Sequence, residues 1–201
     1  MTGGFILKNI VMMYVTLLPS IIAAILNMVW CKLPILKKIQ IPMDFGKNFY
    51  DKKRIFGDNK TWKGFIGYLI LNTIIMIIWG LICNIFKINQ YNYFYINYEN
   101  TLTLNILIGF LLGLGYSLFE LPNSFIKRRL DIKPGKTTKG LKKIFFIILD
   151  QADSVFGCCL VVWMFYNLGL KLYLLYVVVG ASTHIIFNML LYFLKVRKNM
   201  F

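Results

Sequence analysis

The stretch from Gly64 to Phe86, GFIGYLILNTIIMIIWGLICNIF, contains no charged side chain. A helix needs about 20 predominantly apolar residues to cross the hydrocarbon core of a bilayer, and this stretch is long enough. It therefore predicts a transmembrane helix, around which the rest of the chain can be interpreted.

Four further stretches are similarly apolar: residues 5–30, 102–119, 144–168 and 170–194. Over the whole chain, 58% of residues are hydrophobic and only 15% are charged, against about 25% in ordinary soluble domains. This composition excludes a soluble globular protein, a disordered chain and a disulfide scaffold. We predict an all-α polytopic membrane protein, a single domain over residues 1–201 with five transmembrane helices.

Two of these spans have distinctive features. Pro19 lies in the middle of the first span and predicts a kink. That span is too long for the core of a signal peptide and lacks a small-residue cleavage site, so we expect it to be a retained anchor. The last two spans are separated only by a few residues around Gly169, which predicts a tight helical hairpin.

Basic residues are concentrated in two connections between spans. Residues 31–63 contain nine Lys or Arg and residues 120–143 contain eight, whereas residues 87–101 contain one. The positive-inside rule places the two basic loops in the cytosol, with the N-terminus outside and the C-terminus cytosolic. Topology and attraction to anionic head groups explain much of this asymmetry. They do not explain the acidic residues.

Two acidic residues, Asp150 and Asp153, lie inside a predicted span. At 1.5 Å per residue they are about 9 and 13 Å below its start at Ile144. An ionised Asp near a span centre costs about 2.5–3.5 kcal/mol, so it indicates function. The i, i+3 spacing places both carboxylates on one helix face, where they must share a proton or a cation. Their oxygen atoms, together with substrate phosphates, suit Mg²⁺. A proton-sharing structural pair is the alternative.

The last span carries His184 and Asn188 on one face, at i, i+4 spacing. Counted back from Lys195, they lie about 16 and 10 Å deep, which brackets the depth of the two aspartates. We predict one polar pocket that opens to the cytosol. A packing role for His184 remains an alternative.

The two cytosolic loops carry groups suited to phosphate. The first ends with KRIFGDNKTWKG, Lys53 to Gly64, directly before a helix N-terminus. Such a terminus presents free N–H groups and a positive dipole end, which favour a phosphate. The second contains NSFIKRR, Asn123 to Arg129, after a helix break expected near Pro122.

Other uses of these residue types are not expected. The four cysteines show no C-x-x-C spacing, so neither disulfides nor a zinc site is predicted. The basic residues are crowded against a membrane and mixed with acids, so no nucleic-acid partner is expected.

Four motifs occur in a characteristic order: KRxxGDxKTWxG, NSFIKRR, DQxDS from Asp150 to Ser154, and HxxxN from His184 to Asn188. From about Pro42 onward the chain resembles the CDP-archaeol synthase family, small relatives of the phosphatidate cytidylyltransferases. The resemblance implies a five-helix, multi-pass enzyme of the cell membrane with its active site facing the cytosol. Such an enzyme joins CTP to a membrane lipid phosphate, needs Mg²⁺ and releases pyrophosphate.

The chain departs from the archaeal pattern at one place. Where archaeal members commonly have Gly-Asp, this chain has Phe119-Glu120-Leu121-Pro122, and we take Glu120 as the equivalent acid. The departure leaves open whether the lipid is ether-linked or an ordinary diacyl phosphatidate.

The resemblance also implies roles for individual residues. In this chemistry the lipid phosphate is already ionised, so the site must chiefly bring two anions together and stabilise departing pyrophosphate. The expected metal ligands are Asp150 and Asp153, with Glu120 and Asp58 as helpers. The expected phosphate-binding cations are Lys60, Lys127, Arg128 and Arg129, of which Lys127 and Arg128 act with the two aspartates. The remaining substrate-binding residues are Thr61, Asn123, Ser124, His184 and Asn188.

Two other functions would share some of these features. A small transporter of an anionic substrate would also show basic loops, buried acids and helix N-termini at depth. A CDP-alcohol phosphotransferase would space several aspartates around a Gly-Ala-Arg core, which this chain lacks. The expected partners are CTP, the lipid phosphate and the bilayer, and a homodimer is a further candidate assembly.

Overall fold

The computed structural model describes residues 3–136 and 138–195. Five long helices in this part of the chain are apolar enough to cross a membrane: α1 Gly3–Lys32, α2 Trp62–Ile85, α4 Leu102–Arg129, α5 Leu141–Phe165 and α6 Gly169–Phe193. The all-α membrane fold is thus confirmed, and the helix ends lie within three residues of the predicted span limits, except at the end of α4. Three short helices lie in the connections: η1 Lys37–Ile39, η2 Asn89–Tyr91 and α3 Tyr93–Asn97.

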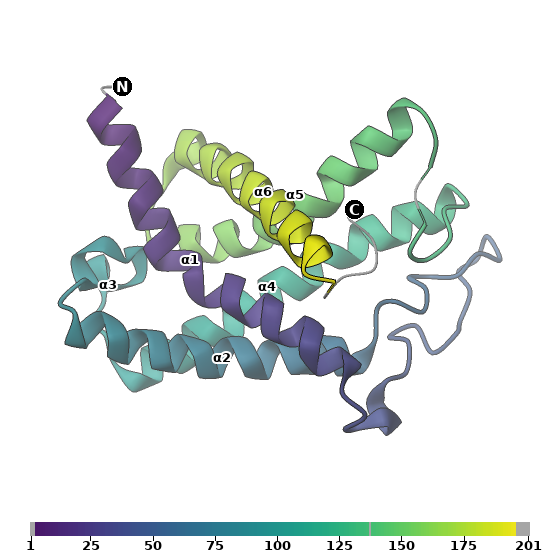
Figure 1. Ribbon diagram of the computed structural model, residues 1–201, viewed down its shortest axis with the longest axis horizontal. Coiled ribbons are helices and arrows are strands. Elements are labelled where there is room, and N and C mark those ends of the chain that lie inside the picture. The colour runs from purple at the N-terminus through teal and green to yellow at the C-terminus, as the bar shows by residue number, and fades with distance from the viewer. Residues whose placement is uncertain (1–2, 137, 196–201) are drawn as a thin grey trace.

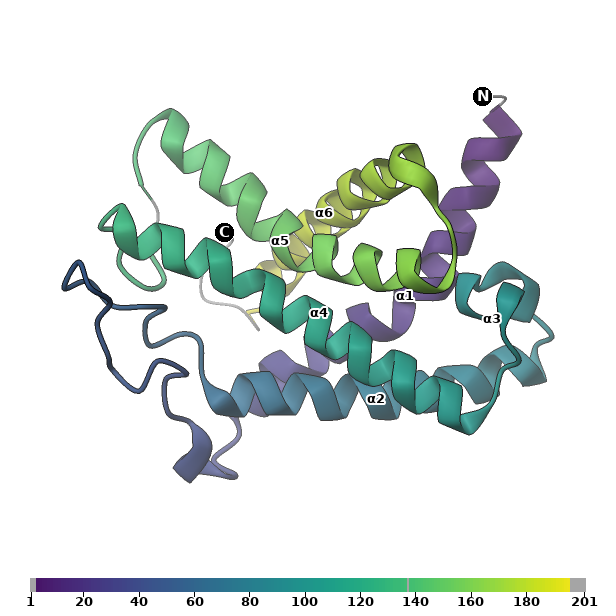
Figure 2. The ribbon, with the colours of Figure 1, turned by 180° about the vertical axis from the view of Figure 1, so that it is seen from behind.

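The helices run alternately up and down and pack in chain order. The α2 helix packs against α1 and α4, α4 packs against α5, and α5 packs against α6 (Figures 1 and 2). We call the end with the connections 33–61, 130–136 and 138–140 the loop end, and the end with the connections 86–101 and 166–168 the far end. Both basic loops therefore lie at the same end of the bundle, as the predicted topology requires.

Glycines allow the central helices to approach closely. A Cβ atom at Gly157 of α5 would lie 2.1 Å from the Gly115 carbonyl oxygen of α4. A Cβ atom at Gly109 of α4 would lie 2.6 Å from the Thr73 Cα atom of α2. Small residues at such contacts are typical of membrane helices, which gain little from hydrophobic burial and associate through close packing.

The predicted break near Pro122 is wrong, because α4 continues through this residue to Arg129. Proline removes one backbone donor, but the neighbouring helices hold α4 in place, and membrane helices tolerate this loss. Pro19 likewise lies inside α1, which changes direction along its length (Figure 1). Because α4 is continuous, Asn123 and Lys127 share one helix face at i, i+4 spacing.

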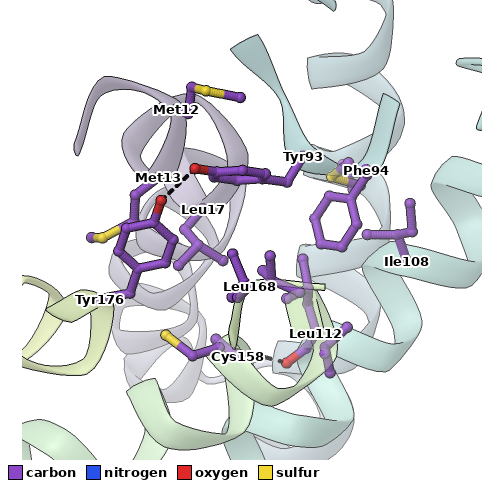
Figure 3. Close-up of a cluster of buried hydrophobic side chains, with 14 of the residues drawn as sticks. Met12, Met13, Leu17, Tyr93, Phe94, Ile108, Leu112, Cys158, Leu168 and Tyr176 are labelled. Atoms are coloured by element: carbon purple, nitrogen blue, oxygen red, sulfur yellow. Dashed lines mark hydrogen bonds between the residues drawn. The ribbon is translucent and has the colours of Figure 1, made fainter. Parts of the chain in front are cut away.

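The far end of the bundle contains a tightly packed core with a neutral polar network. The Tyr93 hydroxyl donates to Asn9 Oδ1 over 2.6 Å and lies 2.5 Å from the Tyr176 hydroxyl. The Tyr176 hydroxyl lies 3.1 Å from the Asn9 carbonyl oxygen, to which it can donate. Figure 3 shows the two tyrosines among Met12, Met13 and Leu17 of α1. We call Asn9, Tyr93 and Tyr176 the far-end network.

Candidate functional site

The two aspartates of α5 meet an amide and an ammonium from α4. Asn123 Nδ2 donates to Asp150 Oδ1 over 2.6 Å and to Asp153 Oδ2 over 2.7 Å. The Lys127 ammonium pairs with both oxygens of Asp150. Asn123 and Asp153 are buried, whereas 32% of the Asp150 side chain is exposed. We call Asn123, Lys127, Asp150 and Asp153 the carboxylate cluster.

The carboxylate cluster has oxygen atoms suited to a hard divalent cation. The Asn123 Oδ1 atom is buried and accepts no hydrogen bond, and rotating the amide by 180° would turn this oxygen toward both carboxylates. Two carboxylates and an amide oxygen are the donors that Mg²⁺ prefers. Within residues 3–136 and 138–195, however, no three His, Cys, Asp or Glu side chains gather closely enough to hold a metal. The structure therefore does not assemble Asp58 and Glu120 with the aspartate pair as a four-carboxylate site.

Lys60 and Glu120 form an ion pair beside the carboxylate cluster. Burial disfavours the charge on Lys60, but the neighbouring carboxylates, chiefly that of Glu120, outweigh this and raise the pKa of Lys60 above its ordinary value. Asp153 and Asp150 contribute to the same shift. Lys60 is therefore a fixed cation within the field of all three acids.

A cavity of about 280 Å³ begins at this ion pair and runs along α1 and α6. Its charged side chains lie at the loop end, where Asn59, Lys60, Thr61, Glu120 and Asn188 line it. Other polar side chains line it along its length: Ser20, Asn27, Ser117, Ser154, Thr183 and His184. Toward the far end the lining is mostly apolar, and it stops at Met13 of α1 and Gly180 of α6. We call this cavity the groove.

His184 and Asn188 both line the groove, whereas Asp150 and Asp153, which were predicted to share one polar pocket with them, are not part of its lining. The α5 helix holds His184 and Asn188 in place. His184 Nδ1 lies 3.3 Å from the Gln151 carbonyl oxygen, and Asn188 Nδ2 donates to Gln151 Oε1. Gln151 was missed by the sequence analysis, although it lies inside the DQxDS motif. Its position one residue after Asp150 turns it about 100° around the helix, toward α6, which is the signal that could have identified it.

Two predicted substrate-binding residues, Thr61 at the start of α2 and Ser124 near the end of α4, lie outside the carboxylate cluster. Thr61 caps α2, because its Oγ1 atom accepts a hydrogen bond from the Gly64 N–H group over 3.1 Å. Ser124 is half-buried on α4 beside Asn123. The predicted helix N-terminus is therefore present, with one of its free donors satisfied by its own cap.

The first loop is organised around a buried aspartate, Asp44. It accepts hydrogen bonds from the backbone N–H groups of Gly46, Phe56 and Gly57, and from the Arg54 guanidinium. Burial alone would raise the pKa of Asp44, but these donors outweigh it and hold that pKa well below its usual range.

Asp58 belongs to this organised loop rather than to the carboxylate cluster. Arg54 also pairs with Asp58 over 2.9 Å, and the Asp58 side chain is 68% exposed. This pairing places Asp58 with the supports of the loop.

The two arginines that end α4 differ in their partners. Arg129 Nη2 donates to the carbonyl oxygens of Lys53 and Arg54, its Nε lies 2.6 Å from an Asp51 oxygen, and its guanidinium stacks on Phe125. Arg129 thus fastens the first loop to α4.

The Nε and Nη1 atoms of both arginines are buried without hydrogen-bond partners. Arg129 is nevertheless tied to Asp51 and to two loop carbonyl oxygens, whereas the Arg128 guanidinium has no ion pair or hydrogen bond within residues 3–136 and 138–195 and lies against Gly57. Gly57 has φ +103°, and a Cβ atom there would lie 2.8 Å from Pro134 Cγ, so only glycine fits between the two loops. Of the two arginines, Arg128 is the one suited to bind an anion.

The site thus has two adjoining parts of different character. The carboxylate cluster and Arg128 offer charged groups for a polyanion and its cation, and the groove offers an apolar channel with a polar mouth. Lys60 and Glu120 belong to both, because they line the groove and lie within the field of Asp150 and Asp153. Such an arrangement can hold a polyanion against the polar end of an amphiphile.

Comparison with known proteins agrees with this arrangement. The family model described as CarS-like, CDP-archaeol synthase, matches residues 6–201. A CDP-archaeol synthase from Pyrococcus furiosus is 42% identical over 107 residues, which are 53% of this chain and 56% of that protein. A CDP-archaeol synthase from Pyrobaculum islandicum is 30% identical over 161 residues, 80% of this chain and 82% of that protein. With the Pyrococcus relatives, the chain spans little more than half of their length.

A solved structure shares the fold. It is described as an intramembrane enzyme for archaeal membrane lipids biosynthesis, and it aligns with a TM-score of 0.59 at 20% sequence identity. The alignment covers 88% of this chain and 92% of the solved one. At this identity the likeness supports the arrangement of the helices.

Proposed function

Because the chain belongs to the CDP-archaeol synthase family, we propose that it is a membrane-embedded cytidylyltransferase that joins CTP to a lipid phosphate. The products are a CDP-lipid and pyrophosphate. The observation that carries this proposal is the junction at Lys60 and Glu120, where a charged cleft adjoins an apolar groove. The two substrates have matching characters, because CTP is a polyanion and the lipid phosphate is an anionic head group on hydrocarbon chains.

The proposed reaction needs positioning more than proton transfer. An ionised oxygen of the lipid phosphate attacks the α-phosphorus of CTP, and the bond from that phosphorus to the bridging oxygen of the β-phosphate breaks. Its electrons leave with pyrophosphate. The main obstacle is the repulsion between two anions, which fixed cations reduce. Lys60, at the mouth of the groove, would hold the lipid phosphate, and Lys127 and Arg128 would hold the phosphates of CTP.

We further propose that Asp150 and Asp153 hold Mg²⁺, with Asn123 as a third oxygen donor after its amide rotates. Bound there, the ion would supply charge neutralisation to the phosphates of CTP. Lys127, which neutralises Asp150 in the structure, would then be free to turn toward a phosphate. Glu120 would keep Lys60 oriented at the junction, and Asp58 would support the first loop through Arg54.

The lipid and the orientation are part of the same proposal. The names of the relatives favour an archaeal ether-linked lipid phosphate over phosphatidate. The loop end, with its two basic connections, would face the cytosol, where CTP is available. The competing function, transport of a small anion, would use the same charges without consuming CTP.

The test is an assay of purified protein in detergent with labelled CTP. We expect a CDP-lipid and an equal amount of pyrophosphate when Mg²⁺ and an archaeal lipid phosphate are present, less product with phosphatidate, and none with EDTA. If the protein instead moves an anion into vesicles without consuming CTP, the cytidylyltransferase proposal is wrong.

A further inference from the structure

The α1 and α6 walls of the groove are joined toward the far end. There Tyr14 of α1 lies 2.7 Å from Thr183 Oγ1 of α6. The Thr183 hydroxyl can donate to the Val179 carbonyl oxygen over 2.8 Å, which leaves its oxygen to accept from Tyr14. Beyond this bridge Tyr176 meets Asn9, so α6 is fastened to α1 a second time. Figure 3 shows Met13 and Leu17, which line the groove at this end, packed with Tyr93 and Tyr176, and we take this core as the end of the groove.

The other end of the groove is open and polar, which fixes the orientation of its occupant. Lys60 and Asn188 lie at the loop end, His184 lies about 6 Å deeper beside Thr183, and the lining becomes richer in aliphatic and methionine side chains toward Met13. An amphiphile would therefore place its anionic group at Lys60 and its hydrocarbon toward Met13. A free anion would leave the apolar part unfilled.

We propose that the groove holds a hydrocarbon chain of the lipid phosphate and that its closed end, formed by Met13, Leu17 and the Tyr14–Thr183 bridge, limits the chain length. This inference rests on the proposed function and adds a specificity-determining element to it. Transfer of a chain from bilayer to groove gains little free energy, since lipid is as apolar as the lining. Discrimination is therefore steric, and a chain too long for the groove must bend or stay partly outside.

The position of a bulky substitution along α1 should determine the longest hydrocarbon chain that the groove accepts. Ile21 and Ile25 both line the groove and lie one helical turn apart, about 6 Å along the helix. Tryptophan at either position would shorten the groove, and Ile25 is nearer the polar mouth. The longest chain accepted should therefore decrease from the unmodified protein to Ile21→Trp, and further to Ile25→Trp. Leu26→Trp is the matched control, because Leu26 is on the same helix, 40% exposed and outside the groove.

The experiment measures kcat/KM for a series of lipid phosphates that differ only in chain length. For chains beyond each cut-off we expect kcat/KM to fall about tenfold or more, as for an extra methylene in a closed pocket, with shorter chains unchanged. Equal losses at all chain lengths, or profiles identical to that of Leu26→Trp, would overturn the inference.

A second measurement does not depend on turnover. A lipid phosphate with a photoreactive diazirine at its chain end should label α1 near Met13 and α6 near Gly180 on irradiation. Labelling spread over the outer helix faces would place the chain in the bilayer and refute the inference even if the enzyme is active. A protein that labels at the closed end but forms no CDP-lipid would refute the proposed function and retain the groove as a lipid site.

Discussion

Two buried polar clusters join helices in this protein, and they differ in charge and in hydrogen bonding. The far-end network connects α1, α3 and α6 through neutral hydroxyl and amide groups. The carboxylate cluster connects α4 and α5 through two acids, one lysine and one amide. The donor–acceptor distances are near 2.6 Å in both clusters, so hydrogen-bond length alone does not distinguish a structural cluster from a functional one.

The difference lies in what each cluster leaves unused. In the far-end network the Asn9 oxygen atoms and both tyrosine hydroxyls take part in hydrogen bonds within the protein. In the carboxylate cluster, Asn123 Oδ1 is buried without a partner, and Arg128 nearby on α4 has two buried nitrogen atoms in the same state. Unpaired buried polar atoms cost stability. Their retention beside two acids is consistent with the proposed ligand binding, whereas a satisfied neutral network is typical of structural support.

The sharpest test of this comparison is Asp153→Asn, which removes one charge and preserves the side-chain shape. We expect the rate of CDP-lipid formation to fall by about 10³-fold or more, because a proposed cation ligand is lost. Stability should not decrease, since the substitution removes a buried charge whose desolvation is costly. The measurements are turnover and the thermal unfolding temperature in detergent. Near-normal turnover would show that the acids are a structural pair.

The sequence predicted the helices and the face shared by Asp150 and Asp153, because hydrophobic length and helical spacing are local properties. It did not predict that Asn123 meets both acids. That contact depends on the register between α4 and α5, which is determined where Gly115 and Gly157 touch. The expected break at Pro122 would also have separated Asn123 from the part of α4 that sets this register, whereas α4 continues through both.

The first loop could not be predicted for a related reason. Its order comes from one buried carboxylate, Asp44, which gathers donors from across the loop. Neither this burial nor the pairing of Asp58 with Arg54 follows from residue spacing, so Asp58 was predicted to lie near the metal. For Arg129, a predicted phosphate ligand, the sequence likewise did not predict that its Nη2 atom donates to loop carbonyl oxygens.

A smaller loss of activity is expected for Lys127→Ala. Lys127 neutralises Asp150 within the cluster and is proposed to hold a CTP phosphate, so we expect kcat/KM for CTP to fall about 10²-fold. The matched control is Lys53→Ala, which also breaks a lysine–aspartate pair. The Lys53–Asp131 pair is largely exposed and worth at most about 1 kcal/mol, so turnover there should change little. If kcat/KM for CTP fell equally in both variants, Lys127 would contribute only to the net positive charge of the loop end and would not hold a CTP phosphate.

The smallest effect on activity is expected at the far-end network, from Tyr93→Phe. The substitution removes the hydroxyl that donates to Asn9 and meets Tyr176, and leaves buried acceptors with one donor fewer. We expect a loss of about 1–2 kcal/mol in stability, measured as a lower unfolding temperature in detergent. The control is Tyr91→Phe, because Tyr91 is 39% exposed at the same end and its substitution should be nearly neutral.

Turnover per folded molecule should stay unchanged for Tyr93→Phe, because the neutral network supports the closed end of the groove without contacting the charged cleft. A selective loss of turnover at full stability would show that this network, too, takes part in function, and the distinction between the two clusters would fail.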